Sequence, residues 1–174
     1  MAGLRKGVCY RRIKRAYTRK SKYKSKNYLT TSPILKISRY DMGNLSKKFN
    51  YKVVLITKDT LQIRHNAIEA ARQMINRKLE ITLGNNYHLK INMYPHHALR
   101  ENKMLGGAHA DRLQTGMSHA FGKVVGAAAQ VKKGKILFTA SVDKEGLEIA
   151  RESLWSAVPK LPCKCSIDVK ENVL

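Results

Sequence analysis

Residues 51–79 read YKVVLITKDTLQIRHNAIEAARQMINRKL, and this stretch decides the fold class. Its first seven residues, Tyr51–Thr57, form an apolar run rich in β-branched side chains, which predicts a mostly buried strand. A helix is expected from about Arg64 to Leu79, because the apolar residues there recur at helical spacing. They form one stripe that consists of Ala67, Ile68, Ala71, Met74, Ile75 and Leu79.

Strand and helix patterns continue on the C-terminal side. Residues 84–86 (Gly-Asn-Asn) break the chain, and Tyr87–Tyr94 then alternates apolar and polar side chains, which predicts a half-buried strand. Residues 124–131 and 136–142 are expected to form two strands of a hairpin around the turn Lys132–Lys135. In the second of these strands, the side chains expected to point inward are Ile136, Phe138, Ala140 and Val142.

The last elements are a helix and a strand. Asp143 is a favourable N-cap for the helix, which Pro159 and Pro162 end. The apolar stripe of the helix consists of Leu147, Ala150, Leu154, Ala157 and Val158. The final strand is expected to present Cys163, Cys165, Ile167 and Val169 on one face.

These elements predict the α+β class, with two helices packed on one face of a mixed β-sheet. Residues 1–30 are expected to form a basic N-terminal arm that is disordered on its own, since they lack a sustained apolar period. Residues 31–174 are expected to form a single domain with a long loop at about residues 96–120. The second sheet face and this loop would be left free for a partner.

The loop at residues 96–120 has no clear period and contains Gly106, Gly107 and Gly116. Loops of this length in compact domains are uncommon and are usually functional or disordered. Between Glu101 and Ala120 it carries two acidic and two basic residues, so it is almost neutral within a strongly basic chain. It is therefore interpreted as a finger that probes a partner rather than as a phosphate clamp, and a surface excursion without function is the alternative.

The charge of the chain calls for a polyanionic partner. The 174 residues include 34 Lys and Arg against 12 Asp and Glu, a formal net charge of +22. Residues 1–40 contain 13 basic residues and no acid, whereas residues 143–174 contain five basic and six acidic residues. Nucleic acid is the first candidate partner and an anionic membrane surface is the second.

The sequence does not favour the membrane alternative. No apolar run approaches the roughly 20 residues needed to span a bilayer, and no apolar segment typical of a signal peptide follows the basic start. A membrane-surface helix would place Lys and Arg beside Trp or Phe, yet Trp155 lies in the least basic region. Three cysteines without framework spacing favour a reducing compartment.

The arm favours RNA among polyanions. Tyr10, Tyr17, Tyr23 and Tyr28 are interleaved with its Lys and Arg residues. Cationic side chains neutralise phosphates, and tyrosine rings and arginine planes stack on unpaired bases. A merely solvated basic tail, or a nuclear-import or heparin-type patch, is the alternative, but such patches are usually shorter.

Enzymatic and metal-dependent functions have weak support in the sequence. The alternative of a metal-dependent or RNA-modifying enzyme would use His96, His97, His109 and His119. Their spacing does not match that of zinc ligands, and few acids stand near them. Cys163 and Cys165 are interpreted as core residues. No catalytic residue, metal ligand or cofactor is therefore predicted, and the chain is not expected to be an enzyme.

Several stretches across the chain carry a resemblance to a known family. They are Gln62–Arg72, Asn86–Lys90, Tyr94–Met104, Ala110–Met117, Phe121–Lys123 and Lys160–Pro162. The chain resembles the large-subunit ribosomal proteins called L-ten-e in archaea and eukaryotes, which are the counterpart of bacterial L-sixteen. The segment Leu105–His109 departs from the pattern of that family.

The resemblance implies a hammerhead-type core and a structural protein of the large ribosomal subunit in the cytoplasm. It implies binding to large-subunit rRNA near the central protuberance and the stalk base, beside neighbouring ribosomal proteins. It also implies support of tRNA near the A site, with the loop Glu101–His119 directed toward the peptidyl transferase centre.

Two sets of site residues are predicted. The rRNA-binding set consists of Arg5, Lys6, Arg11, Arg12, Lys14, Arg15, Tyr17, Arg19, Lys20, Lys22, Lys24, Lys26, Arg64, His96, His97, Arg100 and Lys123. The set in the loop near tRNA and the peptidyl transferase centre consists of Lys103, Asp111 and Arg112.

Overall fold

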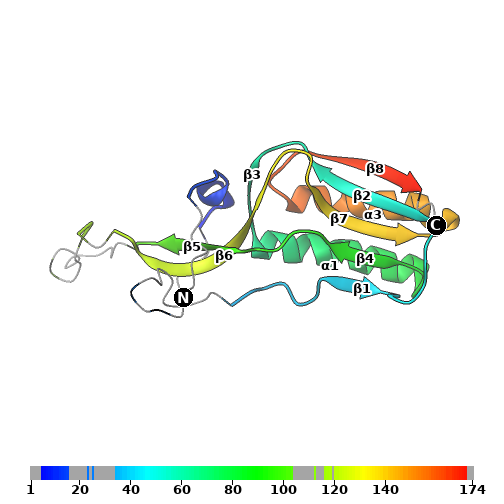
Figure 1. The fold of residues 1–174 in the computed structure, drawn as a ribbon, viewed down its shortest axis with the longest axis horizontal. Helices are drawn as coiled ribbons and strands as arrows, with labels where there is room; N and C mark the ends of the chain where they lie inside the picture. The colour runs from blue at the N-terminus through cyan, green and yellow to red at the C-terminus, as the bar shows by residue number, and fades with distance from the viewer. Residues whose placement is uncertain are drawn as a thin grey trace.

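The computed structural model describes residues 5–15, 23, 25, 34–103, 112, 116–118 and 120–171. Two α-helices and two β-sheets make up this part of the chain (Figure 1), which confirms the α+β class. The helices are α1 (His65–Leu83) and α3 (Leu147–Ala157), and short 3-10 turns are η1 (Gly7–Tyr10), η3 (Lys144–Gly146) and η4 (Val158–Lys160). The strands are β1 (Asp41–Gly43), β2 (Tyr51–Thr57), β3 (Leu61–Arg64), β4 (His88–Ile91), β5 (His97–Glu101), β6 (Lys123–Val131), β7 (Ile136–Val142) and β8 (Cys165–Glu171).

The strands form two sheets rather than the single mixed sheet that was expected. A five-stranded sheet has the order β1-β4-β7-β2-β8, and a three-stranded sheet has the order β3-β6-β5. Every strand pair within the described residues is antiparallel. The reason is that α1 connects β3 of one sheet to β4 of the other, so this helix does not return the chain to a parallel neighbour in the same sheet.

The two sheets meet where two connections cross. The chain passes from β2 to β3 through residues 58–60 and from β6 to β7 through residues 132–135, so both pairs of strands change sheets at this point (Figure 1). The amide of Gly134 donates to the carbonyl of Thr57 at 2.8 Å, and the amide of Lys133 donates to the hydroxyl of Thr60 at 3.1 Å. Gly134 has φ +83°, a left-handed conformation that favours glycine in the predicted hairpin turn.

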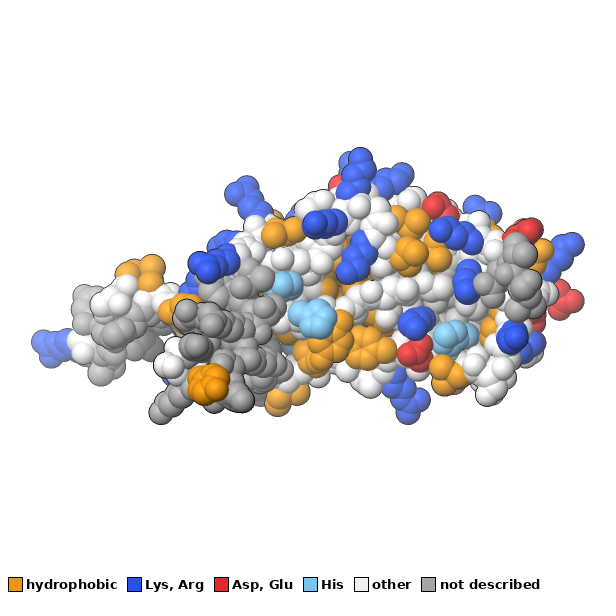
Figure 2. All heavy atoms as spheres, in the orientation of Figure 1, with side chains coloured by type: hydrophobic (Ala, Val, Ile, Leu, Met, Phe, Trp, Pro, Cys, Tyr) orange, Lys and Arg blue, Asp and Glu red, His pale blue; other side chains and the backbone are white. Residues whose placement is uncertain are grey.

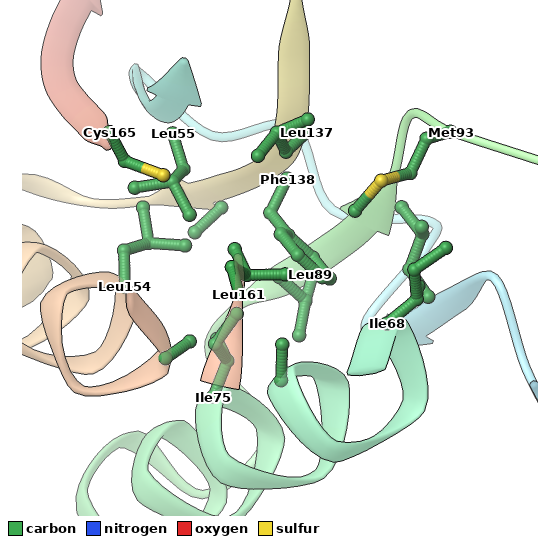
Figure 3. Close-up of a cluster of buried hydrophobic side chains, with 14 of the residues drawn as sticks. Leu55, Ile68, Ile75, Leu89, Met93, Leu137, Phe138, Leu154, Leu161 and Cys165 are labelled. Carbon is green, nitrogen blue, oxygen red and sulfur yellow. The ribbon is translucent and has the colours of Figure 1, made fainter. Parts of the chain in front are cut away.

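Both helices pack on one face of the five-stranded sheet and enclose the core. Leu55 and Phe138 point from the sheet toward Ile75 of α1 and Leu154 of α3, and all four side chains are fully buried (Figure 3). The opposite sheet face is not simply open, because Val54, which alternates with inward-facing neighbours in β2, is also buried.

The predicted helix on residues 64–79 is confirmed and is one turn longer than expected. It ends at Leu83, where the amide of Gly84 donates to the carbonyl of Glu80 at 3.0 Å. The buried stripe ends at Leu79, and the last turn is largely exposed. Leu83, four residues after Leu79, continues the stripe as a partly buried residue that packs against the core, so the helical spacing extends into the last turn.

The strands expected at Tyr51–Thr57 and residues 124–131 are confirmed, as is the alternating burial of residues 87–93. Three details were wrong. Asp143 makes no side-chain cap bond and instead forms an ion pair with Lys47 at 2.8 Å, so α3 begins after η3. Val169 is 45% exposed rather than inward-facing, because β8 is an edge strand that extends past the core. In β7, Leu137 is fully buried although it was expected to point outward.

The long loop predicted at residues 96–120 begins later than expected. His97–Glu101 form β5, which pairs with β6 from His97↔Ala128 to Glu101↔Lys123. This strand has few apolar residues of its own, and a partner distant in sequence supplies its hydrogen bonds. Local periodicity therefore carries little sign of it.

Candidate nucleic-acid interface

The first part of the basic arm lies on the three-stranded sheet. The amide nitrogen of Gln62 in β3 donates to the carbonyl of Arg11 at 2.9 Å, and its side-chain amide donates to the carbonyl of Tyr10 at 3.0 Å. Gln130 in β6 donates to the carbonyl of Lys14 at 2.9 Å. The carbonyl groups of the arm thus accept hydrogen bonds from the sheet, and its charged side chains stay exposed.

Glu101 holds the other end of this arm segment. Its carboxylate forms an ion pair with Arg5 and accepts a hydrogen bond from the hydroxyl of Tyr10 at 3.2 Å. Burial, and then the Glu101 carboxylate, raise the pKa of Tyr10, so its hydroxyl remains a donor. Arg64 donates to the carbonyl of Arg5 at 3.1 Å, and its guanidinium lies 5.7 Å from the centre of the Tyr10 ring.

Residues 5–15 of the predicted arm thus make defined contacts with the sheet. These contacts are polar, since η1 has no buried residue and no apolar stripe. Polar contacts of this kind leave no hydrophobic period in the sequence. Tyr23 and Ser25 are also described, and the remainder of residues 16–33 lies outside the described part of the chain.

The docked arm closes one side of a pocket of about 250 Å³, here called the arm pocket. The arm contributes Arg12, Lys14 and Arg15 to its lining, and β5 contributes His97 and Arg100. Five predicted rRNA-binding residues from two distant parts of the sequence thus surround one cavity. A concave site with this much positive charge attracts a polyanion.

Arg100 is held in place beside an aromatic ring. It donates to the carbonyl of Phe121 at 2.6 Å, and its guanidinium lies 4.2 Å from the centre of the Phe121 ring. Phe121 also lines the arm pocket and is 44% exposed. A guanidinium stacked on an exposed ring offers both a charge and a flat surface to a nucleotide.

His97 contributes a neutral ring to the arm pocket. Burial, and then the neighbouring His96, lower the pKa of His97. Its Nδ1 is buried without a hydrogen-bond partner among the described residues.

A row of three rings lies beside β5. The Tyr40 and Tyr94 rings are stacked with centroids 5.4 Å apart, and the His96 ring lies 4.5 Å from Tyr94. Tyr94 is 45% exposed, so the row can receive a further flat group. Burial, and then the neighbouring Tyr94, raise the pKa of Tyr40 to about 12.

A second pocket, of about 280 Å³, lies at the start of α1 and gathers Arg5, Arg64 and Lys103.

Lys123 begins β6 and pairs across the strands with Glu101. Lys6, Arg11 and Arg112 are exposed, and Arg112 stands apart from both pockets. The remaining predicted residues are Tyr17, Arg19, Lys20, Lys22, Lys24, Lys26 and Asp111, and they lie outside the described residues.

Figure 2 shows how charge is distributed on one face of the molecule. Lys and Arg side chains are spread along it, whereas the visible acidic side chains lie toward the end that holds the five-stranded sheet. This agrees with the balanced charge of residues 143–174. The three-stranded sheet and the arm are the more basic end.

Some residues that build the interface were missed by sequence reasoning. Gln62 and Gln130 look like ordinary strand residues, and nothing in the local pattern distinguishes them. The role of Glu101 could have been predicted, because an isolated acidic residue in a basic region is a natural ion-pair partner. The exposure of Tyr94 could also have been predicted, since the alternation of residues 87–94 already placed it on the polar face.

The histidines and cysteines are not brought together as a metal site in the part of the chain that is described. His109 and His119 lie outside that part. Cys163 and Cys165 are buried in the core with their sulfur atoms 3.5 Å apart, which confirms their interpretation as core residues. No described helix has the length and apolar character to cross a bilayer.

A comparison with known protein families matches residues 13–168 to the family of ribosomal proteins L16p/L10e. The chain belongs to this family. Three relatives carry the name large ribosomal subunit protein uL16. The Staphylothermus marinus protein is 48% identical over 149 residues, covering 85% of this chain and 86% of the relative. The Methanospirillum hungatei protein is 46% identical, covering 88% of each chain, and the Sulfolobus acidocaldarius protein is 43% identical, covering 95% and 93%.

Membership in the L16p/L10e family confirms the resemblance found in the sequence. It makes the chain a structural ribosomal protein with a role in translation, and not an enzyme. The family match covers the three-stranded sheet and the arm from residue 13 onward, whereas residues 5–12 of the arm lie outside it.

Proposed function

We propose that this chain is a constituent of the large ribosomal subunit and binds large-subunit rRNA through the arm and the three-stranded sheet. The observation that carries the proposal is the arm pocket, where cations from the arm and from β5 surround one cavity. The names of the relatives support the large subunit as its location. Free energy of binding would come mainly from phosphate neutralisation, so affinity should fall steeply with salt.

The arm pocket gives this proposal a direct test. Arg12→Gln combined with Arg15→Gln removes two exposed cations that have no part in the core. Removing one cation that neutralises a phosphate should reduce the salt dependence of binding by roughly one unit of log K per log salt. We expect weaker binding of the full-length protein to protein-free large-subunit rRNA and a salt slope that is shallower by about two of these units.

A matched control removes the same charge elsewhere. Lys164→Gln combined with Lys170→Gln changes two exposed lysines near β8, at the acid-balanced end. This variant should keep the salt slope of the natural protein. Equal effects of the two double variants would mean that binding follows net charge and not this interface, and the proposal would then be wrong.

We further propose that the loop Glu101–His119 acts on tRNA near the A site and the peptidyl transferase centre. In support, β5 and β6, which flank residues 102–122, extend away from the helix-covered sheet (Figure 1). The almost neutral charge of the loop also suits a role other than anchoring to phosphates. Arg112 is exposed and available for this role.

Deletion of residues 104–119 tests the loop separately from rRNA binding. We expect subunits to assemble with the shortened protein and to bind A-site tRNA less well. Failure to assemble, with normal tRNA binding in any particles that do form, would contradict this assignment.

The location near the central protuberance and the stalk base is also proposed, on the strength of the resemblance alone. Neighbouring ribosomal proteins are the expected partners of the acid-balanced end. That end exposes Trp155 beside Glu148, Arg151, Glu152 and Ile167, which together line a hollow of about 480 Å³. Glu152 is already paired with Lys78. An exposed aromatic ring among charges of both signs suits a protein segment better than it suits RNA. Hydroxyl-radical footprinting of assembled subunits would test both locations.

A further inference from the structure

The pocket at the start of α1, here called the helix pocket, has features that the docked arm does not explain. Its volume is about 280 Å³. Its lining includes Arg5, Arg64, His65, Asn66, Lys103 and Gly126. Three of these residues are cationic, and two belong to the first turn of a 19-residue helix.

The N-terminus of α1 is uncapped. Arg64 occupies the N-cap position and makes no side-chain cap bond, and the first turn contains no acidic residue. The first amide groups of a helix have no partner within the helix and carry a partial positive charge. Among them, the amide of Ala67 reaches the side chain of Asn66 at 3.1 Å. An anion is the usual ligand where such amides meet basic side chains.

His65 supplies a second and independent sign of a ligand. This ring is only 9% exposed, it lines the helix pocket, and its Nδ1 has no hydrogen-bond partner among the described residues. Burial, and then Lys36 and Arg64, lower its pKa, so the ring is neutral at neutral pH and has one N–H to donate. The ring nitrogen on the Gly126 side of the pocket is Nε2, and a neutral ring that carries its proton there can donate to a ligand in the pocket.

Gly126 is a third sign. It lies in β6, the central strand of the three-stranded sheet, where a glycine weakens the strand. Its φ is not in the left-handed region. A Cβ there would meet the Nε2 of His65 at 3.5 Å and its Cε1 at 3.9 Å, which are ordinary van der Waals distances. Neither backbone conformation nor packing within the chain therefore requires a glycine.

The β6 strand is also irregular at this point. The register shifts between Leu99 and Arg100, so that Leu99 pairs with Gly126 but Arg100 pairs with Val124. Bulges of this kind are frequent beside functional sites, and a glycine in a strand often marks a close approach by a ligand. The bulge and Gly126 together leave space next to His65.

The charge of the helix pocket is positive after internal pairing. Glu101 is its acidic residue, and that carboxylate is already engaged by Arg5 and by the hydroxyl of Tyr10. Arg64 and Lys103 remain as cations without a carboxylate partner in the pocket. With Arg5 paired to Glu101, two positive charges are left, and an anionic group suits this pocket.

We propose that the helix pocket holds one phosphate group of the rRNA backbone. His65 and the first amides of α1 are the hydrogen-bond donors, Arg64 and Lys103 supply the positive charge, and Gly126 leaves room for the phosphate oxygens. This inference rests on the proposed rRNA binding and assigns one phosphate contact within it.

Gly126→Ala is the decisive variant, because it separates the ligand from the fold. An added methyl group would lie at ordinary contact distance from His65, so the thermal unfolding temperature should stay the same or rise slightly. The same methyl group would occupy space needed by the phosphate. Loss of a charge-assisted hydrogen bond weakens binding by roughly tenfold, and we expect a reduction of this size in rRNA affinity.

Ethylation interference identifies the phosphate itself. Protein-free large-subunit rRNA is sparingly ethylated on its phosphates, bound by the full-length protein, and read by primer extension. Ethylation removes the charge of a contacted phosphate, so contacted positions are depleted from the bound fraction. In Gly126→Ala, one position should lose this interference and the others should keep it. Lys103→Gln, an exposed change, should affect the same position, whereas Lys164→Gln should affect none.

Each result decides something. If Gly126→Ala is folded and shows unchanged affinity and interference, the phosphate site is wrong and rRNA binding stands. If Gly126→Ala unfolds, Lys103→Gln alone decides, and an unchanged interference pattern in that variant overturns the site. If the natural protein does not bind rRNA at all, both the proposed function and this inference are wrong.

Discussion

At the scale of single residues, the buried His65 and the half-buried His97 make stability depend on pH. Burial lowers the pKa of both His65 and His97. In the unfolded chain both rings take up a proton below about pH 6.5, whereas in the folded chain they do so at lower pH. The unfolded state therefore binds more protons in this window. The free energy of unfolding should fall as pH decreases from 6.5 toward the folded pKa values.

The pH effect of His65 can be isolated by substitution. His65→Gln cannot take up the proton, so its free energy of unfolding should decline less steeply between pH 7 and pH 5 than that of the natural protein. Urea titrations at several pH values measure this difference. Identical slopes in the two proteins would show that His65 does not contribute.

Two isoleucines of α1 allow the contribution of side-chain burial to the free energy of unfolding to be measured. Ile75 is fully buried and Ile81 is 76% exposed in the same helix. Ile75→Ala should lower the free energy of unfolding by about 2–5 kcal/mol, because it removes transfer energy and leaves a cavity. Ile81→Ala is the matched control and should stay within about 0.5 kcal/mol of the natural protein. Denaturant titration of both variants measures this, and similar effects would contradict the packing described.

Burial could be predicted for single residues where it depends on pattern, as for Cys163 and Cys165. Five residues predicted to bind rRNA line the arm pocket, and their role stays a prediction. Gln62 and Gln130 could not be predicted, because their contacts join carbonyl groups 52 and 116 residues away. A side-chain amide that binds a distant backbone leaves no periodic signal.

At the scale of elements, the arm segment 5–15 and the three-stranded sheet act as a unit held by polar contacts. Gln62→Leu combined with Gln130→Leu removes the two side-chain amides that bind the arm carbonyls of Tyr10 and Lys14. The arm should then detach more often, and trypsin should cleave after Arg11, Arg12 and Arg15 several times faster. Mass spectrometry of the released fragments measures the rate, and an unchanged rate would show that the arm is held by other contacts.

Elements with a clear apolar period in their own sequence were predicted. Strands that form by pairing with a strand distant in the sequence were not. The strand β2 and the helix α1 carry enough apolar side chains to reveal their periods. The four-residue β3 and the strand β5 are both completed by β6, which lies far along the chain. Short strands of this kind acquire their structure from the ladder and not from local preference.

At the scale of the whole molecule, the arm and the core are separable in stability but not in function. No residue of η1 is buried, so deletion of residues 1–28 should leave the thermal unfolding temperature nearly unchanged. The deletion removes 11 Lys and Arg residues, and incorporation into large subunits should fall sharply. Sucrose-gradient sedimentation of subunits measures this, and normal incorporation of the truncated protein would refute the role of the arm.

The distribution of charge over the molecule could be predicted, whereas the arrangement of the sheets could not. The contrast between residues 1–40 and residues 143–174 already indicated a basic end and a balanced end. The division into two antiparallel sheets depends on the crossing near Gly134 and Thr57. That crossing is a tertiary contact between two turns, each of which looks like an ordinary turn in the sequence.

The hydrogen bond between Gln130 and Lys14 also has a consequence in time. The two residues are 116 positions apart, and synthesis proceeds from the arm toward β6. At a synthesis rate of roughly 5–20 residues per second, about 6–23 seconds pass between synthesis of Lys14 and synthesis of Gln130 in β6. During that delay the strongly basic arm lacks part of the sheet surface on which it docks. The arm of the nascent chain is thus most accessible to polyanions before the three-stranded sheet has formed.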